Sequence, residues 1–379
     1  MGNVDPKGFY IEKDATSDSY AVICYNSFAH ETGERLQVHQ YSGDHQELSN
    51  SFYGKVGDYK YLNYIAMLVK EDAVYLATYG YNTERSGGKD SKIIVSRLRK
   101  GEKDFSHQHI EMSDDFSKTT GVMRYNPGNQ KIQLLTSTLI EDKKAKPNKD
   151  GVITRYQLAL MNYVDPQTLD VKSQVLKFEK LSDYIKANLN DKNVVGPPQD
   201  MFIDPDNTTS IISEELYQNS EYDTHSTSNS TAFGNVGLTQ YSPDGEETYA
   251  FGFPKRHGCF GFLDIFSHSR KVKGYWQYLN NGVGFSHTGY QDENFFSFDY
   301  INTGKARYII YNDLPSNFDK KANEEPETLS TFHIGHAVGR TIGKNSGSIT
   351  CLVRLRIEIV QWLPFSHHTT FGLLTLTLR

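Results

Sequence analysis

The chain has 379 residues with 37% hydrophobic content, which is enough for one large all-β domain or for two average domains. Its net charge of −6 is spread out without a long basic run, which excludes the footprint of a nucleic-acid-binding protein. Aromatic residues make up 13% of the chain, and this excess favours β-sheet because flat rings pack well on a pleated surface.

Three cysteines, Cys24, Cys259 and Cys351, are odd in number and far apart. They predict neither a disulfide framework nor a metal knuckle, and each is expected to be a small buried residue. The sequence has no transmembrane run, and its first residues lack the apolar core of a signal peptide. We therefore expect no membrane span, and no signal peptide in the chain as given.

Alternating apolar and polar residues on both sides of short turns predict a series of β-hairpins. One kind of turn links two apolar strands and falls near residues 15, 72, 128, 206 and 303. A second kind joins more polar strands near residues 43, 101, 166 and 243. Proline marks four of these turns at steps of 39, 39 and 38 residues, and it presets φ for the first central position of a turn. These prolines are Pro127, Pro166, Pro205 and Pro243.

The repeating unit is two hairpins, or four strands, and it recurs five times. An apolar strand pair followed by a polar pair is typical of a β-propeller blade, whose inner strands are buried on both faces. We therefore predict an all-β propeller of four-stranded antiparallel blades over residues 1–330, with five recognisable blades and a divergent or incomplete last one. A large β-sandwich is the alternative, but sandwich strands would not sort into an apolar and then a polar pair each time.

Geometry places the middle loop of each blade, and the link to the next blade, on one face of a propeller. The middle loops are long and polar, and they span residues 27–35, 81–91, 141–151, 216–234 and 312–328. One link, residues 179–191, has a helical stripe that includes Leu181 and Ile185, with Ser182 as the capping candidate. Because loops on a rigid scaffold concentrate function, this face is the predicted binding surface, although polar loops can also be merely solvated.

Polar and aromatic groups lie where the second strand of each blade reaches this face. A ring of carboxylates and amides there fits a glycan, or a calcium ion held by oxygen ligands, although no cofactor is required. The predicted binding residues are Tyr25, Asn26, Tyr81, Asn82, Glu141, Asp142, Glu214, Tyr217, Asn312 and Asp313.

An enzyme is the alternative to a binding module: a propeller-type glycosidase or lyase with carboxylates at the channel mouth. Its acids would be Glu214, Glu215 and Asp313. Glu214 and Glu215 directly follow an apolar strand, and strand neighbours point to opposite faces, so only one of them can face the channel.

Other chemical motifs are weak. His107 and His109 have an acceptable metal spacing, but the sequence names no third ligand, so no metal site is predicted. The run "DPDN" at 204–207 begins like a calcium loop but lacks the required Gly and distal Glu, and we interpret it as a hairpin turn. Nucleophile-elbow and phosphate-binding glycine motifs are absent from the sequence.

The tail, residues 331–379, differs in composition from the rest of the chain. All 25 tyrosines occur by Tyr311, and from Thr328 onward the only acid is Glu358. A lost reading frame is the favoured explanation. The alternative is a genuine tail whose runs "VRLRIEIVQWL" and "LLTLTL" alternate as strands do and close the ring.

The segments "MRYNPGNQKIQLLTSTLIE", "PPQDMFIDPDNTTSIISEEL", "GNVGLTQYSPDGEE" and "ARYIIYNDLPSNFDKK" resemble uncharacterised, propeller-like β-rich proteins of Bacteroidetes-type bacteria. This resemblance implies a periplasmic or secreted location and carries over no catalytic residue. From the propeller and its long-loop face we expect a monomeric, non-enzymatic binding or scaffolding module whose partner is an unknown protein or glycan.

Overall fold

The structure, a computed structural model, describes most of the first 260 residues and shorter stretches after them. The described residues are 9–25, 34, 36–54, 56, 59, 61–82, 91–111, 116–141, 155–189, 196–223, 226–260, 271–272, 275–276, 298–304, 306–313, 315–317, 320–321, 323–330 and 354–362. The chain divides into two compact units, Met1–Lys177 and Phe178–Arg379.

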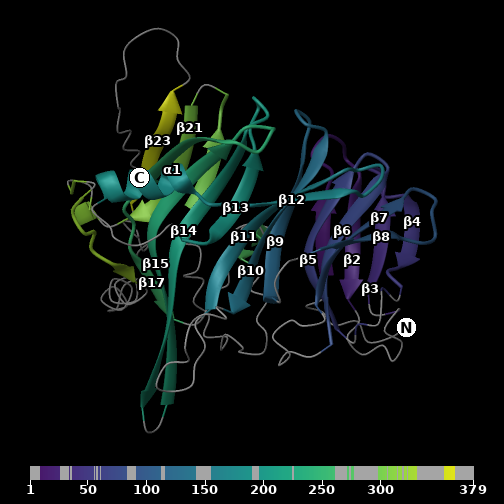
Figure 1. The fold of residues 1–379 in the computed structure, drawn as a ribbon, viewed down its shortest axis with the longest axis horizontal. Coiled ribbons are helices and arrows are strands. Elements are labelled where there is room, and N and C mark those ends of the chain that lie inside the picture. Colours follow the sequence, from purple (N-terminus) through teal and green to yellow (C-terminus); the bar gives the residue numbers. More distant parts are fainter. Residues whose placement is uncertain are drawn as a thin grey trace, which may run out of the picture. The chain divides into compact units, whose positions relative to one another are not determined.

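The first unit consists of three sheets, each with four antiparallel strands in chain order (Figure 1). The first sheet contains β1 (Phe9–Lys13), β2 (Tyr20–Tyr25), β3 (Leu36–Tyr41) and β4 (Glu47–Phe52). The second contains β5 (Tyr61–Lys70), β6 (Ala73–Tyr81), β7 (Lys92–Arg99) and β8 (Ser106–Ile110). The third contains β9 (Phe116–Asn126), β10 (Lys131–Glu141), β11 (Arg155–Val164) and β12 (Val171–Val175).

Each turn predicted in this unit joins two neighbouring strands of one sheet, so the four-stranded repeat is confirmed here. Local chemistry explains the positions of these turns. In the β9–β10 turn the Gly128 amide donates to Asn126 Oδ1 at 2.8 Å, and in the β11–β12 turn the Gln167 amide donates to Asp165 Oδ1 at 2.8 Å. An Asn or Asp side chain that accepts from the backbone two residues later stabilises a turn without help from distant residues.

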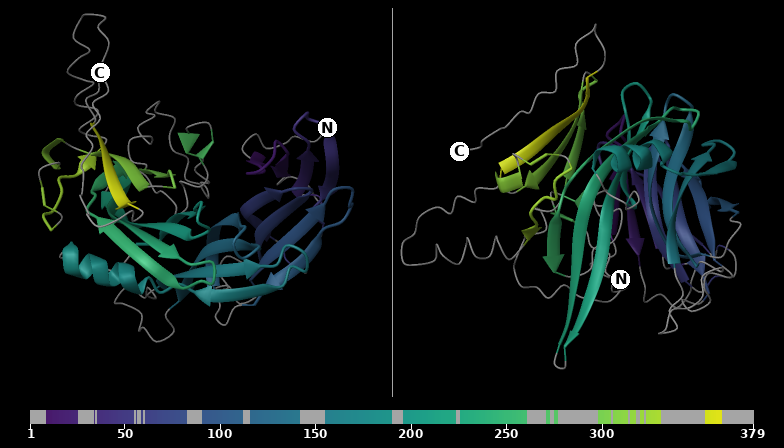
Figure 2. Two further views of the ribbon diagram at one scale, coloured as in Figure 1. Left: turned by 90° about the horizontal axis from the view of Figure 1, so that it is seen from above. Right: turned by 60° about the vertical axis from the view of Figure 1, so that its left-hand side comes forward.

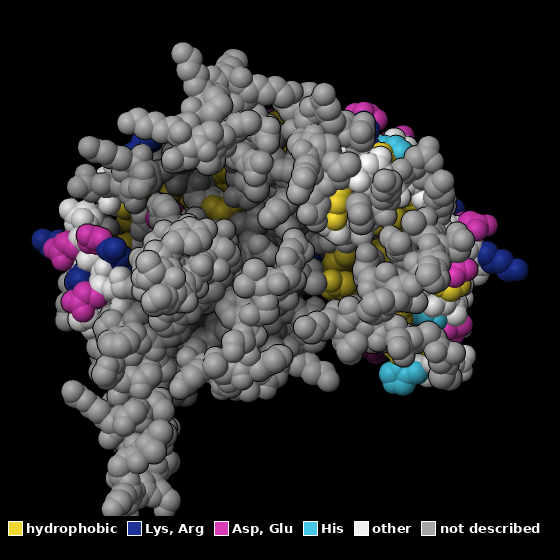
Figure 3. Space-filling view, turned by 90° about the horizontal axis from the view of Figure 1, so that it is seen from below, with side chains coloured by type: hydrophobic (Ala, Val, Ile, Leu, Met, Phe, Trp, Pro, Cys, Tyr) yellow, Lys and Arg dark blue, Asp and Glu magenta, His cyan; other side chains and the backbone are white. Residues whose placement is uncertain are grey.

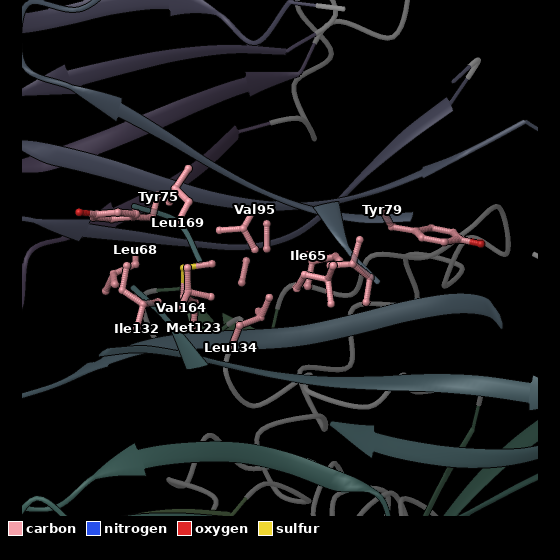
Figure 4. Close-up of a cluster of buried hydrophobic side chains, with 14 of the residues drawn as sticks. Ile65, Leu68, Tyr75, Tyr79, Val95, Met123, Ile132, Leu134, Val164 and Leu169 are labelled. Carbon is pink, nitrogen blue, oxygen red and sulfur yellow. The ribbon is translucent and has the colours of Figure 1, made fainter. Parts of the chain in front are cut away.

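Apolar side chains fill the space between consecutive sheets of the unit. One core joins the first and second sheets and includes Ile23, Val38 and Leu76. A second core joins the second and third sheets, and Figure 4 shows its side chains, Val95 and Leu134 among them. The second sheet is therefore buried on both faces, and every residue of β6 is buried, as predicted for an inner strand.

Polar contacts also join neighbouring sheets of the first unit. The Glu71 amide in the β5–β6 turn donates to Asp14 Oδ2 at 2.9 Å, and Arg97 Nη1 donates to the Pro166 carbonyl oxygen at 3.0 Å. Hydrogen bonds from Thr16, Ser17 and Glu71 hold the pKa of Asp14 below its usual value, although burial alone would raise it.

The described part of the second unit contains the helix α1 (Glu179–Asn188) and three further sheets. A four-stranded antiparallel meander, β13 to β16, is extended by β17 and β22. Its strands are β13 (Pro198–Ile203), β14 (Thr209–Asp223), β15 (Ser226–Tyr241), β16 (Glu247–Phe253), β17 (His257–Phe260) and β22 (Leu329–Ser330). The other sheets are the pair β18 (Lys271–Val272) and β19 (Tyr275–Trp276), and the set β20 (Phe298–Asn302), β21 (Ala306–Asp313) and β23 (Arg354–Trp362).

The predicted helix is confirmed, but its predicted cap is wrong. The helix begins at Glu179 after Phe178, so Ser182 lies within the first turn. A carboxylate from the neighbouring strand β16 replaces the local cap, because the amides of Lys180 and Leu181 donate to Glu247 Oε1 at 3.0 and 3.3 Å. An acceptor at this end satisfies helix amides that have no partner within the helix.

The prediction of a loop at residues 216–234 is also wrong. Strands β14 and β15 continue as a hairpin through this segment, and they pair from Leu216 with Phe233 to Asp223 with Ser226. The run predicted as a tail strand does form β23, which pairs antiparallel with β21. In the described part of the chain no helix is long enough to cross a membrane.

The described structure is thus all-β apart from α1 and the short 3-10 turn Pro315–Asn317. Four of the five predicted repeats form four-stranded antiparallel meanders, whereas the fifth shows the hairpin β20–β21 joined by β23. Among the side chains that Figure 3 colours, Lys or Arg and Asp or Glu lie next to one another at both margins of the view.

Candidate functional site

Four predicted binding residues end the second strand of a repeat. Tyr25 ends β2, Tyr81 ends β6, Glu141 ends β10 and Asp313 ends β21. The backbone of these four residues therefore lies at the predicted place, the end of the second strand of a repeat. Asn26 and Asp142 lie outside the described residues, as do the side chains of Tyr25, Glu141, Tyr217, Asn312 and Asp313.

The ring of Tyr81 packs into the second core rather than lying open at a strand end. It is 9% exposed and stacks on Tyr79 with ring centroids 5.1 Å apart. The Tyr79 hydroxyl donates to Ser91 Oγ at 2.8 Å, and burial raises the pKa of Tyr79. Tyr81 therefore supports the end of β6, and Asn82, which follows it, is half-buried.

Glu214 lies in the interior of β14, not at its end, and its carboxylate is fully buried. Its Oε1 pairs with Lys255 Nζ, and both side chains are 0% exposed. Lys255 comes from the connection between β16 and β17, and its ammonium also lies 5.6 Å from the centroid of the Phe233 ring. A charge removed from water in this way needs such a partner, because an unpaired buried ion costs several kcal/mol.

Glu215 occupies a β-bulge, where the register shifts between the pairs Glu214–Val236 and Leu216–Phe233. Its Oε2 accepts the Asn235 amide at 3.0 Å, so the carboxylate stabilises the backbone of the partner strand at the irregularity. A Cβ on Gly234 would lie only 2.2 Å from this oxygen, so glycine is required there for the contact to form. The adjacent acids thus do different structural work.

The sequence analysis missed two further buried residues of this unit, His257 and Tyr311. His257 is 0% exposed on β17 and sits opposite Phe233 in the register. Its ring lies 6.4 Å from the ring of Tyr311, which is itself 1% exposed. The run "FPKRH" at 253–257 gave a signal, since it places three cationic or titratable side chains directly after an aromatic strand. We call Glu214, Phe233, Lys255, His257 and Tyr311 the Glu214 cluster.

Asp204 is the centre of a second buried network in this unit. Its carboxylate accepts from Tyr300 Oη at 2.9 Å, from Ser210 Oγ at 2.6 Å and from Arg307 Nε at 3.0 Å. Arg307 Nη2 also donates to Asp206 Oδ2 at 3.0 Å. Burial alone would raise the pKa of Asp206, but hydrogen bonds from Thr208 and the Arg307 guanidinium lower it.

The interpretation of "DPDN" as a hairpin turn is confirmed. The Asn207 amide donates to the Asp204 carbonyl at 2.8 Å, and Asn207 adopts φ 63°. The Arg307 guanidinium donates to carboxylate oxygens of both Asp204 and Asp206, so these oxygens serve the turn and its link to β21.

His107 and His109 on β8 contact neighbouring side chains of the first unit. His107 Nδ1 lies 2.8 Å from Ser96 Oγ, and its ring meets the edge of Tyr53 at a centroid distance of 5.1 Å. The His109 ring lies 6.5 Å from that of Tyr59. Among the residues that the structure describes, no group of three acidic, His or Cys side chains is placed to hold a metal ion.

No protein-family model matches the chain, and no curated protein matches it. Among solved structures it is similar to a xylan β-1,4-xylosidase from Bacillus halodurans C-125, with 10% identity and a TM-score of 0.34 over 66% of this chain and 54% of the xylosidase. The chain thus spans about half the length of that enzyme.

Two more solved structures have a comparable likeness. A subtype N11 neuraminidase-like protein of A/flat-faced bat/Peru/033/2010 (H18N11) is 10% identical with a TM-score of 0.29, over 66% of this chain and 86% of that one. A protein of unknown function from Bacteroides caccae is 8% identical with a TM-score of 0.24, over 65% and 82%. These likenesses are too distant to assign a role to any residue of this chain.

Proposed function

We propose that this chain is a non-enzymatic binding or scaffolding module built as a β-propeller, in the periplasm or secreted space, for a protein or glycan ligand. The propeller is supported by the four-stranded meanders and, within the first unit, by cores on both faces of the middle sheet. The location rests on the sequence resemblance alone.

One observation carries the choice of binding over catalysis: the Glu214 carboxylate is fully buried against Lys255. A glycosidase needs one carboxylic acid that reaches the glycosidic oxygen and a second carboxylate on the other side of the bond. Glu214 has no exposed surface, and Glu215, at 6% exposure, binds the backbone of β15. Both acids are thus occupied by the fold.

In one long connection of the predicted binding face, hydrogen bonds join its described residues in a way that suits ligand binding. In residues 312–328, Asn317 Nδ2 donates to the Glu327 carbonyl at 2.9 Å, and the Glu327 amide donates back to Asn317 Oδ1 at 2.7 Å. Ser316 Oγ also donates to Glu327 Oε2 at 2.8 Å. A loop that is closed in advance loses less conformational entropy when it binds a ligand.

The test combines affinity electrophoresis with a reducing-sugar assay on one panel of neutral and acidic polysaccharides. We expect retention of the full chain without turnover, and weaker retention for Asn317→Ala, which opens the loop. Turnover that disappears in Glu214→Gln, Glu215→Gln or Asp313→Asn, with an unchanged melting temperature, would contradict the proposal. If the chain shows neither retention nor turnover with any polysaccharide of the panel, the glycan ligand is excluded, and a protein is left as the ligand.

A further inference from the structure

Two arginines of the first unit reach the same turn. Arg97 and Arg99 lie two positions apart on β7, so their side chains leave the same face of that strand. Arg97 Nη1 donates to the carbonyl oxygen of Pro166 at 3.0 Å and to that of Gln167. Arg99 Nη2 donates to Gln167 Oε1 at 2.8 Å. Both guanidinium groups thus meet at the β11–β12 turn of the neighbouring third sheet (Figures 1 and 2), and we call them the Arg97–Arg99 pair.

One edge of the Arg97 guanidinium has no acceptor in the protein. Arg97 is 7% exposed, and its Nε is buried without a hydrogen-bond partner among the described residues. Its Nη2 also makes no hydrogen bond to a described residue, and unlike Nε it keeps contact with water. Nε and Nη2 form one side of the planar guanidinium and direct two parallel N–H bonds the same way. The fold therefore leaves a bidentate donor edge at the rim of a buried position.

The two positive charges also lack a counter-charge. Among the described residues, the guanidinium groups of the pair donate to carbonyl and amide oxygens and not to a carboxylate. Two acids of the adjoining turns make other contacts, since Glu102 Oε2 accepts the Arg99 backbone amide at 3.0 Å and Asp165 pairs with Lys131 at 2.7 Å. Carbonyl dipoles offset only part of a buried charge, so an anion that reaches this edge is stabilised there.

We propose that the Arg97–Arg99 pair binds a carboxylate of an acidic glycan, supplied by a uronic acid. A carboxylate matches the Nε–Nη2 edge of Arg97 with two parallel, charge-assisted hydrogen bonds. Arg99 is only half-buried and provides the second cation beside it. This inference rests on the glycan ligand of the proposed function, and it assigns the sign of the ligand's charge and a contact site at the end of β7.

The turn suits a sugar carboxylate better than a tetrahedral anion. A phosphate or sulfate is commonly held by several backbone amides that point into one concavity. Here the amides of Gln167 and Thr168 donate to Asp165 Oδ1 at 2.8 and 3.0 Å, so both are already used within the turn. The remaining donors are the guanidinium groups, whose planar edges fit a planar carboxylate.

The surroundings of the pair suit a sugar better than a protein surface. Protein interfaces have a centre that is rich in apolar and aromatic residues. The residues exposed at this turn are instead polar, namely Gln167, Thr168 and Asp170. Because Gln167 Oε1 accepts from Arg99, the side-chain nitrogen of Gln167 remains as a donor for a sugar hydroxyl.

The test is affinity electrophoresis of the full chain in gels that contain polygalacturonate or alginate, each beside its neutral ester. The ester keeps the sugar backbone but removes the charge, so we expect retention by the acids and little by the esters. Arg99→Gln should weaken retention about tenfold, the contribution of one charge-assisted hydrogen bond. The matched control, Lys100→Gln, removes the same charge from the exposed neighbouring residue and should bind as the parent does.

A second variant tests the bidentate edge itself. Arg97→Lys keeps the positive charge but not the planar fork, so retention by the acidic polysaccharides should also fall about tenfold. Melting temperatures verify that all three variants keep the parent fold. Equal weakening in Arg99→Gln and Lys100→Gln, or full retention of Arg97→Lys, overturns the assignment to the pair.

The same gels separate this inference from the proposed function. Equal retention by acids and esters, or retention by a neutral polysaccharide alone, overturns the uronate site and leaves the glycan-binding module standing. Absence of retention by every polysaccharide overturns both the uronate site and the glycan ligand. Polyglutamate serves as the last probe, and stronger retention by it than by the acidic polysaccharides would assign the site to a peptide carboxylate and overturn the glycan.

Discussion

Arg307 Nε donates to Asp204 Oδ2 at 3.0 Å, although 103 positions separate the two residues in the sequence. Asp204 follows β13 and Arg307 lies on β21, so the ion pair links two sheets of the second unit. Their side chains are 1% and 5% exposed. The contact therefore joins the fourth predicted repeat to the fifth through a charge pair that water does not screen.

Removal of the guanidinium should destabilise this unit strongly. Arg307→Met leaves Asp204 charged and buried, and loss of one partner of a buried pair costs about 3–5 kcal/mol. The control, Arg256→Met, removes a cation that is 47% exposed and pairs with Glu325, where the expected cost is below about 1 kcal/mol. Urea unfolding measures both, and equal costs would show that the Asp204 network does not hold the two sheets together.

The Glu214–Lys255 pair should behave as one unit in a double-mutant cycle. Lys255→Met leaves a buried carboxylate without its ammonium, so we expect a loss of about 3–5 kcal/mol of unfolding free energy. Adding Glu214→Leu removes the second charge, and the double variant should be more stable than Lys255→Met alone. Additive losses in urea unfolding would mean that the two charges do not depend on each other.

The approach of α1 to β15 requires a glycine. A Cβ on Gly237 would lie 2.4 Å from Leu181 Cδ2, and Leu181 is fully buried. Gly237→Ala should therefore cost about 1–3 kcal/mol through overpacking. Gly258→Ala on β17 is the control, because its nearest contact would be Thr328 Cγ2 at an ordinary 3.6 Å. Thermal unfolding that lowers the melting temperature equally in both variants would argue against a close helix–sheet approach.

The sequence predicted the hairpins because their turns depend on neighbouring residues alone. Asn126 and Asp165 each accept an amide two positions later, which a sequence pattern can reveal. The four-stranded repeat follows from the regular order of these turns. The stripe of Leu181 and Ile185 likewise predicted α1, because its period is local.

Features that depend on distant residues escaped prediction. Glu247 caps α1 from a strand more than sixty positions away, so the local candidate Ser182 was chosen wrongly. The polar composition of residues 216–234 indicates a loop, but continuous pairing between β14 and β15 overrides that weak local preference. Lys255 as the partner of Glu214 could be found only from the fold, since 41 positions separate them.

Asp165 should make the stability of the first unit depend on acidic pH. Lys131 Nζ at 2.7 Å, together with the amides of Thr168 and Gln167, lowers the pKa of Asp165 from 3.8 to about 2. The folded state therefore favours the ionised carboxylate. The stabilisation that this carboxylate gives the folded state is complete above pH 3.8 and is lost as the pH falls toward about 2.

Because this side chain is partly exposed, we expect Asp165→Asn to cost only about 1 kcal/mol at neutral pH. The difference between parent and variant in urea unfolding should vanish near pH 2, which isolates Asp165 from the other titrating acids. A difference that stays constant down to that pH would mean that the charge of Asp165 contributes nothing to the β11–β12 turn.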